Sequence, residues 1–262
     1  MTKPHRVHYM KPIAIFQHDP LQRPGYLLEF LDERRIPARV LRPCEGDDVP
    51  RSSRFFSGIV VLGSDASVND PALWIERELR LIKDSIACDI PVLGHCFGGQ
   101  LMARALGAAV QKSAFPEIGW STLRLTPAGR PVFGDVDHVH AFNWHYETFS
   151  IPSGAKRTLF GEHCLNKGFV FGRSLAFQSH FEVTEEIIRN WCAAHHLELR
   201  DAHGPAAQLE SHILSCIPER VAAVHVAARS AYAAWVAPMG LPGRAPQSLD
   251  RGVDEWLGAC TR

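Results

Sequence analysis

The sequence has no excess of charge of either sign. Its 262 residues include 28 lysines and arginines and 28 aspartates and glutamates, so the formal net charge is zero. A balanced charge argues against a nucleic-acid-binding surface and against a polybasic patch that binds membranes. The composition, with 46% hydrophobic and 21% charged residues, is that of an ordinary globular protein. We therefore expect neither a nucleic acid nor a membrane as a partner.

Long apolar runs are also missing. No segment approaches the roughly 20 apolar residues that a membrane-spanning helix needs. The first residues, MTKPHRVHYMKPIAIF, contain no apolar stretch of the kind found in a secretory signal. The seven cysteines are odd in number and include no C-x-x-C pair, which favours a reducing compartment over a full set of disulfides. The sequence predicts a cytoplasmic protein.

A phosphate-binding loop of the form G-x-x-x-x-G-K-[ST] is absent. His138, His140 and His145 cluster in the segment DHVHAFNWH, and the first two would share one face of a strand. A metal site there is conceivable, but the pattern alone does not favour one. We predict neither a metal nor a cofactor.

The first hundred residues alternate between short apolar runs and helical patterns. Predicted strands cover residues 12–16, 38–43, 57–64 and 90–94, and predicted helices cover 25–36, 71–88 and 98–107. The strands are apolar throughout, which is typical of a parallel sheet covered on both faces. Right-handed crossovers then give a doubly wound α/β fold with a mostly parallel sheet flanked by helices. Ligands bind such sheets beyond the carboxyl ends of the strands, where Gly63 and Cys96 are expected.

The pattern changes after residue 108. Short strands, partly antiparallel, are predicted at 121–127, 138–149, 155–163 and 174–183, followed by a helix over 184–199. Residues 205–236 are rich in alanine and predict one or two further helices, and 238–252 predict a loop or tail. We expect one domain over residues 1–200 and a C-terminal helical extension over 201–262 that packs on the same domain.

Cys96 lies in a turn that has the form of a nucleophile elbow, Gly94-His95-Cys96-Phe97-Gly98. A strand must turn sharply into a helix there, and small neighbours relieve the crowding. The N-terminus of the following helix favours a thiolate and other anions. A buried structural cysteine in a glycine turn is the alternative. A thiolate nucleophile needs a base, and the base needs a group that orients it.

His180 and Glu182 supply such a pair of groups in the segment LAFQSHFEV. On an extended chain, residues two apart point to the same face. His180 could then reach a thiol while Glu182 holds the imidazole from behind. A histidine near a carboxylate is common by chance, so this pair is informative only together with the elbow.

Together these motifs resemble the class I glutamine amidotransferase family, which uses a Cys-His-Glu triad. Residues 94–100 read G-H-C-F-G-G-Q where the family has G-x-C-x-G-x-Q, and residues 177–183 read F-Q-S-H-F-E-V where it has an apolar residue and Q-x-H-x-E-V. PEIGW (116–120) and FNWHYETFSIPSGA (142–155) look like segments of stand-alone, GMP-synthase-like members. The resemblance covers about residues 12–200 and implies a flavodoxin-like domain.

The resemblance also implies roles for further residues. The backbone N–H groups of Ser64 and Phe97 would form the oxyanion hole, and Gly63, Gln100 and His145 would contact the substrate. The oxyanion strand departs from the family pattern G-G-P-x-S-V, because residues 63–68 read G-S-D-A-S-V. A serine can supply the same backbone N–H if its backbone angles are reachable without strain. The aspartate that follows it would not help near a developing oxyanion unless it points away.

On this resemblance, the chain is an enzyme that releases ammonia from the side chain of L-glutamine through a γ-glutamyl thioester on Cys96. His180 would protonate the leaving ammonia and then activate water, and Glu182 would orient His180. A γ-glutamyl amide or peptide hydrolase of the same fold and a non-catalytic relative remain open. A dienelactone-hydrolase-type α/β-hydrolase fits less well, since its acid precedes the histidine in the chain.

The S-G-G-x-D-S signature of an ATP pyrophosphatase is absent as well. If the chain transfers ammonia, the acceptor site would therefore lie on a partner protein, such as a synthase, or be formed partly by the C-terminal helices.

Overall fold

The structure is a computed structural model that describes residues 10–240. The strands are β1 (Ile13–Phe16), β2 (Ala38–Leu41), β3 (Gly58–Val61), β4 (Val92–His95), β5 (Val110–Leu125), β6 (His138–Phe149), β7 (Lys156–Phe160), β8 (Gly168–Phe171) and β9 (Ser174–Phe177). The helices are α1 (Gly25–Glu33), α2 (Leu73–Ala87), α3 (Phe97–Ala105), α4 (Arg130–Phe133), α5 (Glu185–Ala194), α6 (His196–Asp201), α7 (Glu210–Leu214) and α8 (Ile217–Val236). Short 3-10 turns occur at Pro43–Glu45, Ser53–Phe55 and Ala237–Met239.

All of these strands belong to one sheet with the order β2-β1-β3-β4-β9-β8-β7-β5-β6. The strands from β2 to β9 pair in parallel, and those from β9 to β6 pair antiparallel. The predicted α/β fold with a doubly wound sheet is confirmed, with the addition that the sheet is mixed rather than mostly parallel. Short connections explain the antiparallel half, since β8 and β9 are joined by a turn too short for a crossover helix.

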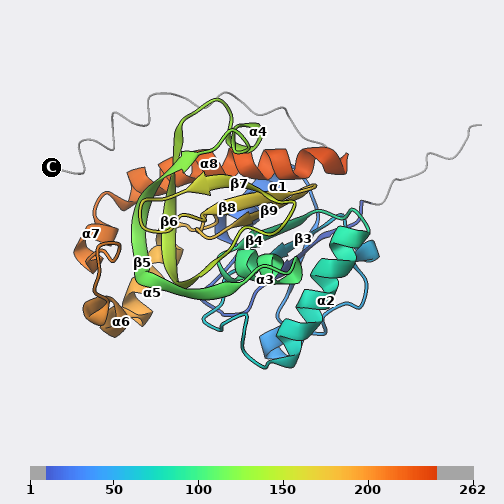
Figure 1. Cartoon of the computed structure of the whole chain (residues 1–262), viewed down its shortest axis with the longest axis horizontal. Coiled ribbons are helices and arrows are strands. Elements are labelled where there is room, and N and C mark those ends of the chain that lie inside the picture. Colours follow the sequence, from blue (N-terminus) through green and yellow to red (C-terminus); the bar gives the residue numbers. More distant parts are fainter. Residues whose placement is uncertain (1–9, 241–262) are drawn as a thin grey trace, which may run out of the picture.

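Helices cover both faces of the parallel half (Figure 1). Along β1, Ile13 and Ile15 pack in a core with α1, α5 and α8, whereas Ala14 and Phe16 pack in a second core with α2 and α3. Successive side chains of a strand point to opposite faces, so a strand that is apolar at every position serves both cores. The continuous apolar runs of the sequence therefore predicted a sheet covered by helices on both faces.

Several element boundaries differ from the sequence-based predictions. β5 begins at Val110, well before the predicted start at residue 121, and its pairing with β6 shifts register between Lys112 and Glu117. Its first half has mostly polar or exposed residues and a proline, which hid the strand from a periodicity argument. β8 and α4 were not predicted. The single helix predicted over 184–199 is divided at His195 into α5 and α6.

The C-terminal helix α8 packs into the same core as α1. Tyr232 and Trp235 are fully buried, and the Tyr232 ring meets the Phe30 ring edge-on with centroids 5.5 Å apart. Figure 1 shows α8 running along the sheet beside α1. The domain boundary at residue 200 stays a prediction, and residues 241–262 of the predicted extension lie outside the described part of the chain. Among residues 10–240, no helix combines the length and the apolar character needed to cross a membrane.

Candidate active site

Cys96 occupies the sharp turn between β4 and α3. β4 ends at the residue before it, and α3 begins at the residue after it. Its backbone angles, φ 50° and ψ −110°, fall in a region that L-residues rarely adopt. Such a conformation costs about 1–3 kcal/mol and persists only where the surroundings hold it. Here the Cys96 N–H donates a hydrogen bond of 2.8 Å to the Phe177 carbonyl oxygen, which ties the turn to β9.

The glycines around Cys96 are required by close packing. A Cβ atom at Gly98 would lie 1.9 Å from the Val61 carbonyl oxygen, and one at Gly94 would lie 2.5 Å from the backbone of Gly98. A Cβ at Gly99 would lie 2.5 Å from the Phe177 carbonyl oxygen. The start of α3 therefore lies directly on the backbones of β3 and β9. This contact brings the helix N-terminus, with its unpaired N–H groups, up to the thiol.

His180 lies beyond the end of β9 and is anchored by its backbone. Its N–H donates to the Phe142 carbonyl oxygen on β6 at 2.8 Å. Its ring Nδ1 lies 2.6 Å from Glu182 Oε1, and both side chains are almost completely buried. Burial alone would lower the pKa of His180, but the negative charges of Glu182 and Cys96 outweigh burial and raise it to about 10. The structure thus brings together the three residues predicted as a triad, with the imidazole held as a cation.

Cys96 and His180 both line one small cavity with a volume of about 40 Å³, whereas Glu182 lies behind His180 and does not line it. Its lining consists of Asp19, Leu21, Gln22, Ser64, Asp65, Cys96, Trp144, His180, Trp191 and His195. Gly63 lies beside it, because a Cβ atom at Gly63 would be 3.0 Å from His180 Cε1. Within the described chain, the Ser64 N–H forms no hydrogen bond with a backbone or side-chain acceptor. Ser64 and Cys96 line the same cavity, and the predicted role of the Ser64 N–H in an oxyanion hole stays a prediction.

Asp65, which the sequence placed near the oxyanion strand, also faces this cavity. Its Oδ1 accepts a hydrogen bond of 2.7 Å from the Gln22 side-chain amide. Burial and the nearby Asp19 charge raise the pKa of Asp65. The Gln22 side chain crosses over Gly63, since its Oε1 would be 2.0 Å from a Cβ atom there. The loop before α1 therefore forms one wall of the cavity next to His180.

Gln100 and His145 do not line the cavity. Gln100 Nε2 donates to the Glu147 carbonyl oxygen at 3.0 Å, and His145 Nδ1 contacts the same oxygen at 3.1 Å. Both side chains therefore support the end of β6 from inside the protein. Their predicted role as direct substrate contacts stays a prediction, and the structure favours an indirect one.

His145 belongs to a buried ionic cluster. The fully buried Lys167 ammonium contacts the Glu117 carboxylate and donates to Asn143 Oδ1 at 2.8 Å and to His145 Nε2 at 2.9 Å. Burial and the Lys167 charge lower the pKa of His145 to about 4. Burial opposes ionisation of Glu117, but His145 and Lys167 lower its pKa to about 2. Glu117, His145 and Cys164 hold ligand atoms within 4.8 Å of one another, but the Lys167 cation stands where a metal ion would bind.

Comparison with known proteins identifies the family. A family profile described as glutamine amidotransferase class-I matches residues 33–189. The chain belongs to the class I glutamine amidotransferase family. The match includes the Cys96 elbow and reaches beyond Glu182.

Individual relatives of this amidotransferase agree with the profile. A glutamine amidotransferase-like protein of Salmonella typhimurium is 27% identical over 208 residues, covering 76% of this chain and 84% of that protein. The crystal structure of a glutamine amido transferase from Methylobacillus flagellatus has a TM-score of 0.85 at 35% identity, covering 92% of this chain and 99% of its counterpart. A glutamine-hydrolyzing GMP synthase of Aeropyrum pernix is 28% identical over 56% of this chain but over only 28% of its own length.

The structure adds contacts near the triad that sequence reasoning missed. His95 lies behind the triad, with Nδ1 3.2 Å from Glu182 Oε2 and 3.4 Å from the Ser179 carbonyl oxygen. Its Nε2 is 3.3 Å from the Tyr232 hydroxyl of α8. Burial lowers the pKa of His95, which favours a neutral ring that accepts from Tyr232. The sequence placed His95 beside the nucleophile, but its contacts could not be predicted because its partners come from distant parts of the chain.

Gln178 was missed as well. Its Nε2 lies 3.8 Å from Cys96 Sγ, and the side chain is fully buried. It belongs to the F-Q-S-H-F-E-V segment, so its place in the motif was the one available signal. Its amide can donate to a thiolate and so help to hold the sulfur in place.

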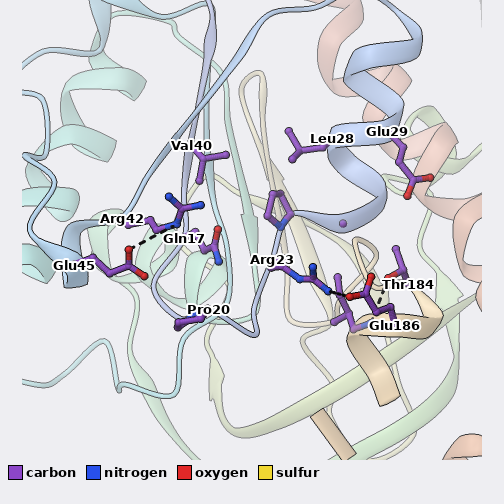
Figure 2. A pocket seen from close by; sticks show the side chains of 13 residues that line it. Gln17, Pro20, Arg23, Leu28, Glu29, Val40, Arg42, Glu45, Thr184 and Glu186 are labelled. Carbon is purple, nitrogen blue, oxygen red and sulfur yellow. Dashed lines mark hydrogen bonds and ion pairs between the residues drawn. The ribbon is translucent and has the colours of Figure 1, made fainter. Parts of the chain in front are cut away.

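A larger pocket of about 440 Å³ lies on the other side of the loop 17–24. Figure 2 shows its lining, in which the Arg23–Glu186 ion pair, 2.7 Å between Nη2 and Oε1, joins the loop to α5. None of the triad residues lines it. Residues of this loop line both this pocket and the cavity at Cys96. Its link to α5 is strengthened by Trp191 Nε1, which donates to the Leu21 carbonyl oxygen at 2.9 Å.

Proposed function

We propose that this amidotransferase domain hydrolyses the side-chain amide of L-glutamine, with Cys96 as the nucleophile. The observation that carries the proposal is the buried His180, held 2.6 Å from Glu182 and electrostatically coupled to the elbow thiol. An imidazolium kept by a carboxylate can stabilise a thiolate at neutral pH. Family membership supports the same reaction class.

In the first half-reaction, the Cys96 sulfur attacks the side-chain carbonyl carbon of glutamine. The carbonyl oxygen gains negative charge, and the N–H groups of Ser64 and Phe97 would stabilise it. The C–N bond then breaks, and His180 gives its proton to the leaving nitrogen, which departs as ammonia. The products of this step are ammonia and a γ-glutamyl thioester on Cys96.

In the second half-reaction, His180 is neutral and accepts a proton from water that attacks the thioester carbon. The C–S bond breaks, glutamate leaves, and the thiolate–imidazolium pair is restored. Glu182 keeps the imidazole oriented through both steps. Gly63, which lies against His180, is part of the substrate wall. Gln100 and His145 would act through the position of β6.

Two other functions follow from the same site. A γ-glutamyl amide or peptide hydrolase would use the same thioester with a different leaving amine. A non-catalytic relative would retain the fold with a closed cavity, and the Gln22–Asp65 contact over Gly63 is the observation that favours it.

We also propose that ammonia is passed to an acceptor on a partner protein. The support is the similarity to one portion of a larger GMP synthase.

The test is ammonia release from L-glutamine by the wild type, Cys96→Ser and Cys88→Ser, with γ-glutamyl-p-nitroanilide assayed in parallel. Cys88 lies at the end of α2, outside the cavity, so its variant is a matched control. We expect release from glutamine that is abolished in Cys96→Ser and retained in Cys88→Ser.

Turnover of the anilide without turnover of glutamine would favour the γ-glutamyl amide hydrolase. Turnover of neither substrate, with Cys96 reacting with iodoacetamide no faster than Cys88, would refute the enzyme proposal.

A further inference from the structure

His18 lies directly behind Gly63, at the start of the segment after β3 that is the candidate oxyanion strand predicted from the sequence. It follows β1, and its side chain is completely buried. Ring Nδ1 is 3.1 Å from the Gly63 carbonyl oxygen, and Nε2 is 3.0 and 3.1 Å from the two carboxylate oxygens of Glu78 on α2. No step of the proposed reaction uses either side chain. Both are nevertheless buried ionisable groups placed next to the site.

The contact with Gly63 requires a hydrogen on His18 Nδ1, because a carbonyl oxygen can only accept a hydrogen bond. On the other side of the ring, Nε2 is within hydrogen-bond distance of both Glu78 carboxylate oxygens. Burial would lower the pKa of His18, but the Glu78 charge, the Glu78 hydrogen bond and the Gly63 carbonyl together raise it. The His18 ring is therefore clamped between Glu78 and Gly63.

The bond to Gly63 also determines where the Ser64 N–H points. The Gly63–Ser64 peptide is planar and trans, so its C=O and N–H groups point in opposite directions. His18 holds the carbonyl on the side away from the cavity. The N–H is thereby directed to the opposite side, where it is unpaired and where Gly63 borders His180. A donor at the carbonyl also polarises the peptide and strengthens its N–H as a donor.

The same imidazole contacts the second candidate oxyanion residue. The ring centroids of His18 and Phe97 are 5.1 Å apart, and His18 stacks on Trp74 at 4.9 Å with an interplanar angle of 27°. Trp74 and Phe97 are themselves 5.5 Å apart. One buried ring thus fixes the Gly63–Ser64 peptide by a hydrogen bond and the start of α3 by packing.

We propose that His18, held by Glu78, is a positioning residue that aligns the two backbone donors of the oxyanion hole. The inference rests on the proposed function and extends it to the residues that keep the site preorganised. An aligned donor acts mainly on the transition state, in which the oxyanion exists. Its loss should therefore lower kcat and leave KM nearly unchanged.

Two isosteric variants separate the two contacts of His18. The amide nitrogen of His18→Asn falls near the position of Nδ1 and can still donate to Gly63. The amide nitrogen of His18→Gln reaches the position of Nε2 and can donate to Glu78 instead. Glu78→Gln removes the charge that holds the ring. Asp84→Asn is the matched control, because Asp84 is another anchoring carboxylate on α2 that binds Ser53 at 2.8 Å, away from the oxyanion strand.

Steady-state ammonia release by all five proteins, with thermal unfolding in parallel, tests the proposal. Removing one oxyanion donor typically lowers kcat about 10²–10³-fold, so we expect a loss of about 10–100-fold for a misaligned one. We expect that loss in His18→Gln, a smaller loss in His18→Asn and in Glu78→Gln, and no loss in Asp84→Asn, with KM within about twofold of the wild type throughout.

A kcat of His18→Gln within about threefold of the wild type would overturn the proposal. So would equal losses in His18→Asn and His18→Gln that follow their melting temperatures, because that pattern indicates a merely structural role. The wild-type rate is read separately: an inactive wild type counts against the proposed function, whereas the ratios among variants of an active one decide the role of His18.

Discussion

Replacing Glu182 with glutamine should remove the charge that makes His180 a strong base. The Glu182 carboxylate lies 2.6 Å from His180 Nδ1, and the pKa of His180 is raised from 6.5 to about 10. At about 1.36 kcal/mol for each pH unit, the imidazolium is favoured by roughly 5 kcal/mol relative to free histidine. Burial opposes this shift, so the stabilisation of the imidazolium by Glu182 and Cys96 together exceeds about 5 kcal/mol. Glutamine keeps the shape of the side chain and loses the charge.

In Glu182→Gln, burial remains while its compensating charge is lost, so the pKa of His180 should fall below 6.5. A histidine with a raised pKa keeps its proton until the pH approaches that value, and one with a lowered pKa is neutral at pH 7.5. The leaving nitrogen would then lack a proton donor. We expect kcat on glutamine to fall about 10²–10⁴-fold, the range for losing an oriented acid–base group. The alkaline limb of kcat/KM should move to lower pH.

The assay is ammonia release between pH 5.5 and 10, with iodoacetamide labelling of Cys96 as a second readout. Glu33→Gln is the control, because Glu33 forms an exposed ion pair with Arg229, 2.8 Å between Oε2 and Nη1. The control should stay within about twofold of the wild type, as expected for a surface ion pair. A Glu182→Gln protein with wild-type turnover and an unmoved alkaline limb would refute the reasoning.

Three further predictions concern packing and buried charge. Gly98→Ala places a Cβ atom 1.9 Å from a β3 carbonyl oxygen and should lower the free energy of unfolding by about 3 kcal/mol or more. Gly172→Ala, whose Cβ atom would have nothing within 4 Å, should lower it by about 1 kcal/mol. Thermal unfolding of the two variants compares these losses. Lys167→Met leaves the buried Glu117 carboxylate without its cation and should lower the free energy of unfolding in urea by about 3–5 kcal/mol. The double variant Lys167→Met/Glu117→Gln should recover part of that stability. Equal stability losses in the single and the double variant would contradict this prediction. Because the pKa of His145 is lowered to about 4, the free energy of unfolding should decrease by up to about 3 kcal/mol as the pH falls from 6.5 to 4. In His145→Gln, the melting temperature should depend less on pH between pH 4 and 6.5.

The parallel half of the fold and the position of the triad could be predicted because their signals are local. A strand buried on both faces is apolar at every position, and a strand-to-helix elbow needs small residues within a few positions of the nucleophile. Cys96 could therefore be placed from its neighbours in sequence, and His180 and Glu182 from their spacing on an extended segment. The antiparallel half was predicted less well. The first residues of β5 form a strand because they pair with β6, and their own composition does not favour one.

The residues around the triad could not be predicted in the same way. His95 was visible only as an unusual neighbour of Cys96, and nothing in the local sequence connects it with Tyr232 on α8. His18 and Glu78 are 60 residues apart and meet only when α2 packs on the sheet. Gln100 and His145 were assigned to the substrate because they occur in the family's motifs. In the folded protein their side chains bind the backbone of β6, and a direct contact with the substrate stays a prediction.

The sequence by itself determined the α/β architecture, the elbow at Cys96 and the pair of groups that can activate it. Each of these depends on the chemistry of residues close together in the chain. Only the tertiary structure decided which buried polar groups surround the site, because burial is tolerable only where partners meet with the correct geometry. The Glu78–His18–Gly63 contact depends on the packing of three separate elements. The candidate nucleophile Cys96 could be placed from the sequence, whereas the contacts of His18 with Gly63 and Glu78 next to it depend on the fold.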